Sequence, residues 1–168
     1  MANLKAYFKN LRPYCIVVFA IYLVMSLFSR KLIVDGSSME PNYHNGDVLK
    51  INLVAYLTSE PQRYDVVAIH TPSMDLIKRI IALPGETVSI DENGKIRING
   101  EIIEDPFAKE AIRQDMRGLA ADTIVLKDNE YFVIGDNRNA STDSRTIGPI
   151  QKINSGISPR VCVPQCAL

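Results

Sequence analysis

Ser38 is the residue of this 168-residue chain whose setting most favours covalent chemistry. It lies in residues 35–41, DGSSMEP, where a glycine and a proline allow a tight turn that leaves a hydroxyl exposed. A serine hydroxyl is a poor nucleophile until a base removes its proton. Chemistry at Ser38 therefore requires a basic side chain elsewhere in the chain. Without such a base, Ser38 is only a turn residue.

The base can be a histidine or a buried lysine. The two histidines, His44 and His70, fall in a predicted turn and at the end of a predicted strand, where a surface role is the simpler interpretation. Burial can lower the pKa of a lysine from about 10.4 to about 8 at a cost of roughly 3 kcal/mol. Lys78 suits this role because it lies within an apolar strand-like run.

Strand alternation directs Lys78 and the neighbouring Arg79 to opposite faces. We therefore expect one of the two side chains in the core and the other in solvent. The simpler alternative is that both are exposed strand charges.

A third segment, residues 135–145, is dense in polar, turn-forming side chains and follows a predicted strand. Asp143 and Arg145 are expected to pair and to fix a loop, and the Ser141 hydroxyl can orient an amine. A plain polar loop is the alternative interpretation of the same residues.

The elements that must position these residues are mainly β-strands. Apolar runs and alternation predict strands at 47–51, 64–69, 76–83, 87–90, 95–98, 124–126 and 131–134. Asn93-Gly94 and Asn99-Gly100 flank residues 95–98, which is a strong hairpin signal. Asp105-Pro106 and the helical spacing of the apolar residues after it predict one short helix that ends near Gly118.

The sequence of the N-terminal segment predicts a membrane anchor. Residues 13–29 carry no charge, and a membrane-spanning helix needs roughly 17–25 apolar residues. A buried soluble helix would show a polar face, and a cleaved signal peptide would end in an Ala-x-Ala-like site, whereas this run ends in Ser29-Arg30-Lys31. We expect a cytoplasmic segment at 1–12, a transmembrane anchor at 13–29 and an extracytoplasmic β-rich domain at 30–168, because basic residues slightly favour the N-terminal side.

Composition excludes several other classes of protein. Nineteen basic and nineteen acidic residues cancel, so no strong field attracts nucleic acid. The three cysteines, Cys15, Cys162 and Cys166, form neither a zinc pattern nor a disulfide framework. Cys162 and Cys166 are free thiols or, outside the cytosol, a disulfide. No P-loop, dinucleotide or metalloprotease motif is present, and we expect no metal and no cofactor.

Four motifs in order resemble those of the bacterial type I signal peptidases, which are serine proteases with a Ser-Lys dyad. They are Ser38-Met39-Glu40-Pro41, residues 64–67 (YDVV), Lys78-Arg79-Ile80 with residues 83–86 (LPGE), and residues 135–145. The resemblance covers the predicted anchor and nearly all of the domain beyond it, and it is to the short, Gram-positive type of sequence. It implies a signal-peptidase/LexA-like antiparallel β-sheet domain.

The resemblance also implies a role for each candidate site residue. Ser38 matches the nucleophile, Lys78 the general base and Ser141 the serine that orients the lysine, while Asp143 and Arg145 match the pair that braces the site. Gly36 stands where some relatives have a serine in the oxyanion hole. The hole is then left to backbone N–H groups, including that of Ser38, and Met39 and Pro41 lie beside the substrate.

The implied reaction is acyl transfer on secreted precursors with small residues, typically alanine, at −1 and −3, which bind as an added strand beside the lipid bilayer. Three alternatives remain. A self-cleaving repressor-type protease would need a DNA-binding helix pair, and a specialised peptidase would process one pilin-like substrate. A tethered β-domain that only binds partners would leave Lys78 exposed and distant from Ser38.

Overall fold

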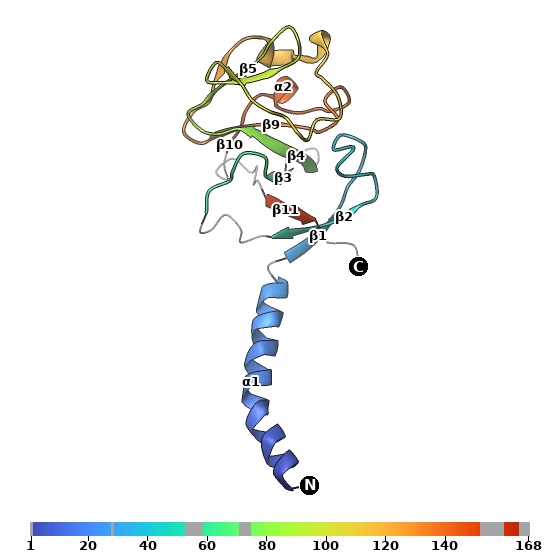
Figure 1. Ribbon diagram of the computed structural model, residues 1–168, viewed down its shortest axis with the longest axis vertical. Coiled ribbons are helices and arrows are strands. Elements are labelled where there is room, and N and C mark those ends of the chain that lie inside the picture. The colour runs from blue at the N-terminus through green and yellow to red at the C-terminus, as the bar shows by residue number, and fades with distance from the viewer. Residues whose placement is uncertain (1, 28, 53–58, 71–74, 152–159, 165–168) are drawn as a thin grey trace.

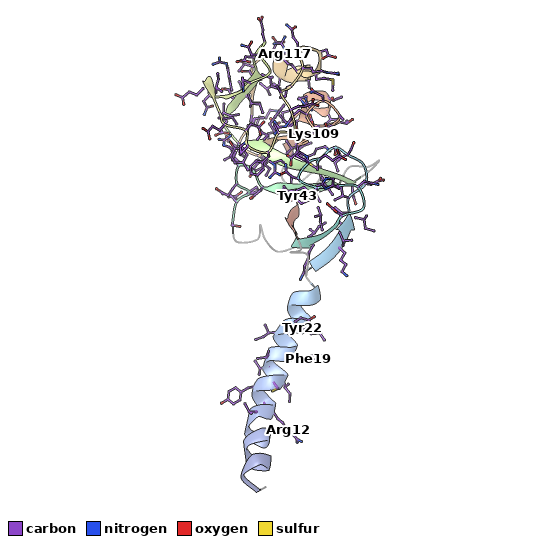
Figure 2. The ribbon with its side chains drawn as sticks, turned by 45° about the vertical axis from the view of Figure 1, so that its right-hand side comes forward. Arg12, Phe19, Tyr22, Tyr43, Lys109 and Arg117 are labelled. Atoms are coloured by element: carbon purple, nitrogen blue, oxygen red, sulfur yellow. The ribbon has the colours of Figure 1, made fainter. Side chains whose placement is uncertain are left out.

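A long N-terminal helix precedes a β-rich domain in the computed structural model, which describes residues 2–27, 29–52, 59–70, 75–151 and 160–164 (Figure 1). The helix, α1 (Ala2–Leu27), runs through Pro13 and so begins before the predicted anchor. Between residues 11 and 23 its large apolar side chains are exposed, and Phe19 and Tyr22 stand well clear of the domain (Figure 2). Among the described residues, no helix is both long and apolar enough to cross a membrane.

The remaining described elements are mainly short strands. They are β1 (Ser29–Ile33), β2 (Val48–Asn52), β3 (Val66–His70), β4 (Asp75–Ala82), β5 (Thr87–Ile90), β6 (Ile96–Ile98), β7 (Glu101–Ile102), β8 (Ile124–Val125), β9 (Glu130–Ile134), β10 (Ile150–Gln151) and β11 (Arg160–Pro164). The helical elements of the domain are the 3-10 turns η1 (Gln114–Met116) and η2 (Gly118–Ala121) and the short helix α2 (Ser144–Ile147).

The strands form two antiparallel sheets. The larger has the order β1-β2-β11-β3-β4-β9-β10, and the smaller has the order β7-β6-β5-β8. In the described ladders β4 pairs with β3 along residues 75–79, whereas β9 pairs with β4 only from Arg79 onward. The first half of β4 therefore has one edge that β9 does not cover, and Lys78 lies on it.

Apolar residues cover both faces of the large sheet. On β3, Val66 and Ala68 pack in one cluster with Met39, while Val67 and Ile69 pack in another. A third cluster joins the end of β4 and β9 to the small sheet. Lys78 and Arg79 on β4 are therefore both buried, although they point to opposite faces of the sheet.

The predicted strands are confirmed, and one predicted element is wrong. Each of the seven predicted runs overlaps a strand, and β1, β7, β10 and β11 were not predicted. The predicted helix over residues 106–118 is absent; this stretch forms turns and η1 instead. The short α-helix of the domain is α2, at residues 144–147.

The physical reason is that tertiary contacts replace helical hydrogen bonds in this stretch. The Lys109 N–H donates to the Asp136 carbonyl at 2.9 Å, and the Arg113 N–H donates to Asn139 Oδ1 at 2.9 Å. Ile112 is buried in the cluster between the sheets. Cys162 lies in β11 with a side chain that the structure does not describe, and Cys166 lies outside the described residues.

Candidate active site

The Ser38 turn is held by its neighbours on both sides. Gly36 has a φ of +91°, which favours glycine, and its N–H donates to Asn45 Oδ1 at 2.9 Å. Met39 is fully buried in the core cluster that also contains Ile77, so its side chain fastens the turn to β4. Pro41 is exposed and follows a cis peptide bond. Ser38 thus lies between a turn at Gly36, whose φ is positive, and the buried side chain of Met39.

Lys78 lies against this turn. Its Nζ donates to the Ser38 Oγ at 2.8 Å, and the lysine side chain is only 2% exposed. The alternative in which Lys78 is exposed and distant from Ser38 is therefore wrong. His44, the histidine alternative whose side chain is described, is 68% exposed on the surface and its Nδ1 lies 4.0 Å from Asp47. The structure does not describe the side chain of the other histidine, His70.

Burial lowers the pKa of Lys78 from its ordinary value of 10.5 to about 8. The Asp143 and Asp136 carboxylates act in the opposite sense and raise it, while the Arg145 guanidinium lowers it further. A share of the lysine is then neutral near neutral pH. A neutral amine at hydrogen-bond distance from a serine hydroxyl can accept its proton.

Arg79 is also buried, so the expectation that one of the two neighbours is solvated is wrong. Its Nε and Nη2 donate to the two carboxylate oxygens of Asp136 at 2.8 and 2.6 Å, and both side chains are almost fully buried. Its guanidinium carbon lies 3.8 Å from the centre of the Phe107 ring. The alternation is as predicted, but each face of β4 is covered.

Asp143 and Arg145 form the predicted pair. Arg145 Nε and Nη2 donate to the two Asp143 oxygens at 2.8 Å each, and both residues are buried. The pair also fixes the backbone, because Asp143 accepts from the Gly135 N–H at 3.0 Å and Arg145 donates to the Met116 carbonyl at 3.0 Å. The charge pair thereby locks the end of β9 to η1.

Ser141 is close to the site but does not make the predicted bond. Its buried Oγ has no hydrogen-bond partner among the described residues. Gly135 lies between this hydroxyl and the Ser38 carbonyl, and a Cβ built on Gly135 would collide with both. The chain therefore needs glycine at this position for the Ser141 and Ser38 segments to approach each other.

Three site residues were not predicted individually: Asp136, Asn137 and Asn42. Asn137 donates from its backbone N–H to the Ser38 carbonyl and from Nδ2 to the Ser37 carbonyl, at 3.0 Å each. Asn42 Nδ2 donates to Asp136 Oδ2 at 2.9 Å. The only signal for Asp136 and Asn137 in the sequence was the polar density of residues 135–145, and Asn42 had only its place in a predicted turn.

A groove of about 290 Å³ runs past the Ser38–Lys78 pair. One wall is the end of β1 with the residues that follow it, and the other is the part of β4 that β9 does not cover. The lining combines apolar and polar side chains and comprises Leu32, Ile33, Val34, Asp35, Ser38, Met39, Asp75, Leu76, Ile77 and Lys78. An extended peptide can add to such a strand edge.

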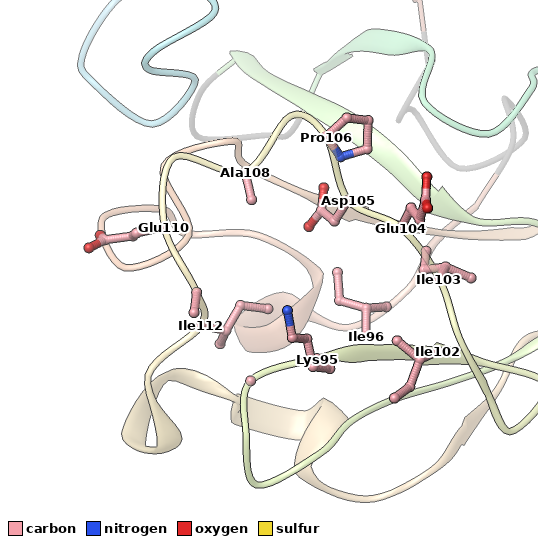
Figure 3. A pocket seen from close by; sticks show the side chains of 12 residues that line it. Lys95, Ile96, Ile102, Ile103, Glu104, Asp105, Pro106, Ala108, Glu110 and Ile112 are labelled. Carbon is pink, nitrogen blue, oxygen red and sulfur yellow. The ribbon is translucent and has the colours of Figure 1, made fainter.

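A larger pocket of about 650 Å³ lies between residues 103–112 and the β6 hairpin (Figure 3). The Lys95 side chain is directed into it, beside Ile96 and Ile112 (Figure 3). Its described lining contains no serine, threonine, cysteine or histidine, and neither Ser38 nor Lys78. The smaller groove is therefore the better candidate for the active site.

A serine hydroxyl bonded to a buried lysine, at the edge of a groove, is typical of hydrolases in which lysine replaces the histidine base. The family model described as "Signal peptidase, peptidase S26" matches residues 6–156. The chain belongs to this signal peptidase family. Membership of this family excludes the alternative of a self-cleaving repressor-type protease.

The curated relatives agree with the family model. The chain is 35% identical over 136 residues to signal peptidase I S of Bacillus subtilis (strain 168), covering 77% of this chain and 73% of that protein. It is 36% identical over 134 residues to signal peptidase I of Bacillus amyloliquefaciens, covering 77% and 71%. The crystal structure of a signal peptidase I from Enterococcus faecalis V583 aligns at 29% identity with a TM-score of 0.47, covering 59% of this chain and 94% of that one.

Proposed function

We propose that the protein cleaves signal peptides from secretory precursors with Ser38 as nucleophile and Lys78 as general base. The observation that carries this proposal is the 2.8 Å contact between Lys78 Nζ and Ser38 Oγ, made by a lysine that is 2% exposed. Burial holds the pKa of this lysine at about 8, which supports its role as a base. Asp143 and Arg145 act on the pKa of Lys78 and on the segment that follows β9 rather than on the substrate.

The reaction proceeds through an acyl-enzyme. Neutral Lys78 takes the Ser38 proton as the hydroxyl oxygen bonds to the scissile carbonyl carbon, and the carbonyl oxygen becomes an oxyanion. Protonated Lys78 then gives the proton to the leaving amine as the peptide bond breaks. In the second half, neutral Lys78 takes a proton from water, which attacks the ester, and returns that proton to the Ser38 oxygen.

The proposed substrate has small residues, such as alanine, at −1 and −3. The edge of β4 at residues 75–78 can pair with an extended peptide, whose alternate side chains then point into the groove. Buried Met39 and Ile77 line this groove, which is only about 290 Å³ in volume. A groove of this size favours methyl-sized side chains beside Ser38 over large ones.

The proposed site of action is a membrane surface, with α1 as a single-pass anchor, the N-terminus in the cytoplasm and the domain on the outer side. The support is the ring of exposed apolar side chains on α1 between residues 11 and 23. Helix α1 is followed closely by β1, whose end forms one wall of the groove. The anchor would therefore hold the groove near the membrane, where a signal peptide ends.

The test is cleavage of a purified precursor with an Ala-x-Ala site by the full chain. We expect a single cut after the second alanine by the wild type, and no detectable cut after Ser38→Ala or Lys78→Ala. A precursor with leucine at −1 is expected to resist cleavage. Near-normal activity in Lys78→Ala would show that another group removes the serine proton.

The pH dependence of cleavage should report the protonation state of Lys78. Because only neutral Lys78 is a base, kcat/KM is expected to rise with pH through an apparent pKa of about 8 and to be low at pH 6. His44→Gln is the matched control, since exposed His44 should leave the profile unchanged. A rise centred near pH 4 to 5 would instead indicate a carboxylate base, at the pKa of about 4 ordinary for that group.

A further inference from the structure

Asn137 contacts both peptide groups of the nucleophile. Its backbone N–H donates to the Ser38 carbonyl and its Nδ2 donates to the Ser37 carbonyl, at 3.0 Å in each case. The Asn137 side chain is nearly buried, at 6% exposed. One residue, 100 positions along the chain from Ser37, thus holds the backbone before and after the nucleophile.

The bond to the Ser37 carbonyl has a consequence for the next N–H. The Ser37 C=O and the Ser38 N–H belong to one planar trans peptide group, so they point in opposite directions. A donor that fixes the carbonyl therefore also fixes the direction of the Ser38 N–H. Among the described residues this N–H has no hydrogen-bond acceptor, whereas the Gly36 N–H is already bonded to Asn45.

Asn137 is itself held by its two neighbours in the sequence. On one side, buried Asp136 is paired with Arg79 and accepts from Asn42. On the other side, Arg138 is fully buried and pairs with Asp105, its Nη2 donating to Oδ1 at 2.8 Å. Two charge pairs therefore fix the backbone on both sides of the Asn137 amide.

We infer that Asn137 is a positioning residue, whose side-chain amide aims the Ser38 N–H at the oxyanion of the peptidase reaction. The inference rests on the proposed function and adds a residue to it. The bond that Asn137 makes is present before substrate binds, so the N–H is preorganised for the charge that develops in the transition state. Asn137 touches neither the substrate nor the lysine in this role.

The test compares Asn137→Asp and Asn137→Ala with Asn139→Asp. The aspartate has the shape of asparagine but no amide donor. Asn139 lies on the same loop, accepts from the Arg113 N–H and donates from Nδ2 to the Ala111 carbonyl, so its replacement removes a loop amide that does not bond to Ser37 and controls for damage to the loop. Cleavage of the Ala-x-Ala precursor, thermal unfolding and inhibition by a peptide aldehyde are measured for the full chain.

For both Asn137 variants we expect kcat to fall by about 10- to 100-fold, less than for outright loss of an oxyanion-hole donor. KM should stay within about threefold, because the interaction strengthens only in the transition state. The aldehyde forms a hemiacetal oxyanion with Ser38, so its affinity should fall with kcat. The midpoint of the pH profile should not move, and Asn139→Asp should cleave as the wild type does.

Several outcomes would overturn the inference. One is a wild-type kcat in both Asn137 variants; another is a rise in KM with kcat unchanged; a third is a shifted pH midpoint. Unfolding of both variants while Asn139→Asp stays folded would make Asn137 a structural residue only. If the wild type itself does not cleave, or Ser38→Ala does, the proposed function fails instead.

Discussion

Asp136→Ala is expected to lower the free energy of unfolding by about 3–5 kcal/mol, because it leaves a buried arginine without its partner. Arg79 is 5% exposed and Asp136 is fully buried, and two hydrogen bonds of 2.8 and 2.6 Å join them. Without the carboxylate, the guanidinium would keep the Tyr64 carbonyl and the Phe107 ring as neighbours. Neither of these neighbours carries a countercharge.

Chemical denaturation of the full chain in mild detergent measures this loss. Asp115→Ala is the matched control, because Asp115 pairs with Arg113 at 3.4 Å with both side chains well exposed. We expect the control to change the stability by less than about 0.5 kcal/mol. The double variant Arg79→Met/Asp136→Leu should recover most of the loss, since it removes both charges. An equal, small loss in Asp136→Ala and Asp115→Ala would contradict the prediction.

The sequence was sufficient to bring Ser38 and Lys78 together but not to describe what surrounds them. The serine stands in a turn with glycine and proline, and the lysine interrupts an apolar run, but residue types alone left Lys78 open between a base and an exposed strand charge. The order of the four motifs, through the resemblance, paired it with Ser38. Arg79 has the same apolar neighbours and was left open. Its partner lies 57 residues away, and nothing in a single sequence fixes a contact of that span.

The role of the polar segment was predicted only where side chains pair with each other. Asp143 and Arg145 are opposite charges two residues apart, and they do pair. Asn137 donates to the backbone carbonyls of Ser37 and Ser38. Because every residue has a backbone carbonyl, the sequence does not indicate which one a distant side chain will contact. The Ser141 hydroxyl was expected to bond to the lysine, yet its oxygen is buried and has no hydrogen-bond partner among the described residues.

Local sequence determines the strands of the small sheet, whereas tertiary contacts determine the structure of the stretch that was predicted to be a helix. Alternation and the two Asn-Gly turns are local, and they correctly predict β5 and β6 with the turns that flank them. The helical spacing after Pro106 was local too, but here the neighbouring loop at residues 136–139 supplies the hydrogen-bond partners. Tertiary contacts outweigh a helix propensity that spans about 1 kcal/mol per residue at most.

Lys78→Met is expected to abolish cleavage and yet to make the protein more stable at neutral pH. Keeping the pKa of a lysine at about 8 instead of 10.5 costs about 3 kcal/mol at 1.36 kcal/mol per pKa unit. Methionine fills a similar volume without charge and gives up one hydrogen bond to Ser38, worth about 1 kcal/mol. The net gain in the free energy of unfolding should be about 2 kcal/mol.

The stability that Lys78→Met gains over the wild type should decrease as the pH rises. Below pH 8 the lysine is charged in both the folded and the unfolded chain, so the full cost of burying the charge is present. Between pH 8 and 10.5 the folded chain loses the proton first, and the stability of the wild type rises relative to the variant. Near pH 10.5 the cost has vanished and only the lost hydrogen bond remains, so the order of stabilities should reverse.

Denaturation of both proteins at pH 7, 8.5, 10 and 11 tests whether the order of their stabilities reverses. Exposed Lys95 offers the control, because Lys95→Met removes a solvated amine and should show no pH-dependent gain. A Lys78→Met gain that is equal at pH 7 and pH 10 would mean that packing, not charge burial, stabilises the variant. A gain that shrinks with pH would show that the fold gives up stability to hold Lys78 as a neutral base beside Ser38, a cost that only function can explain.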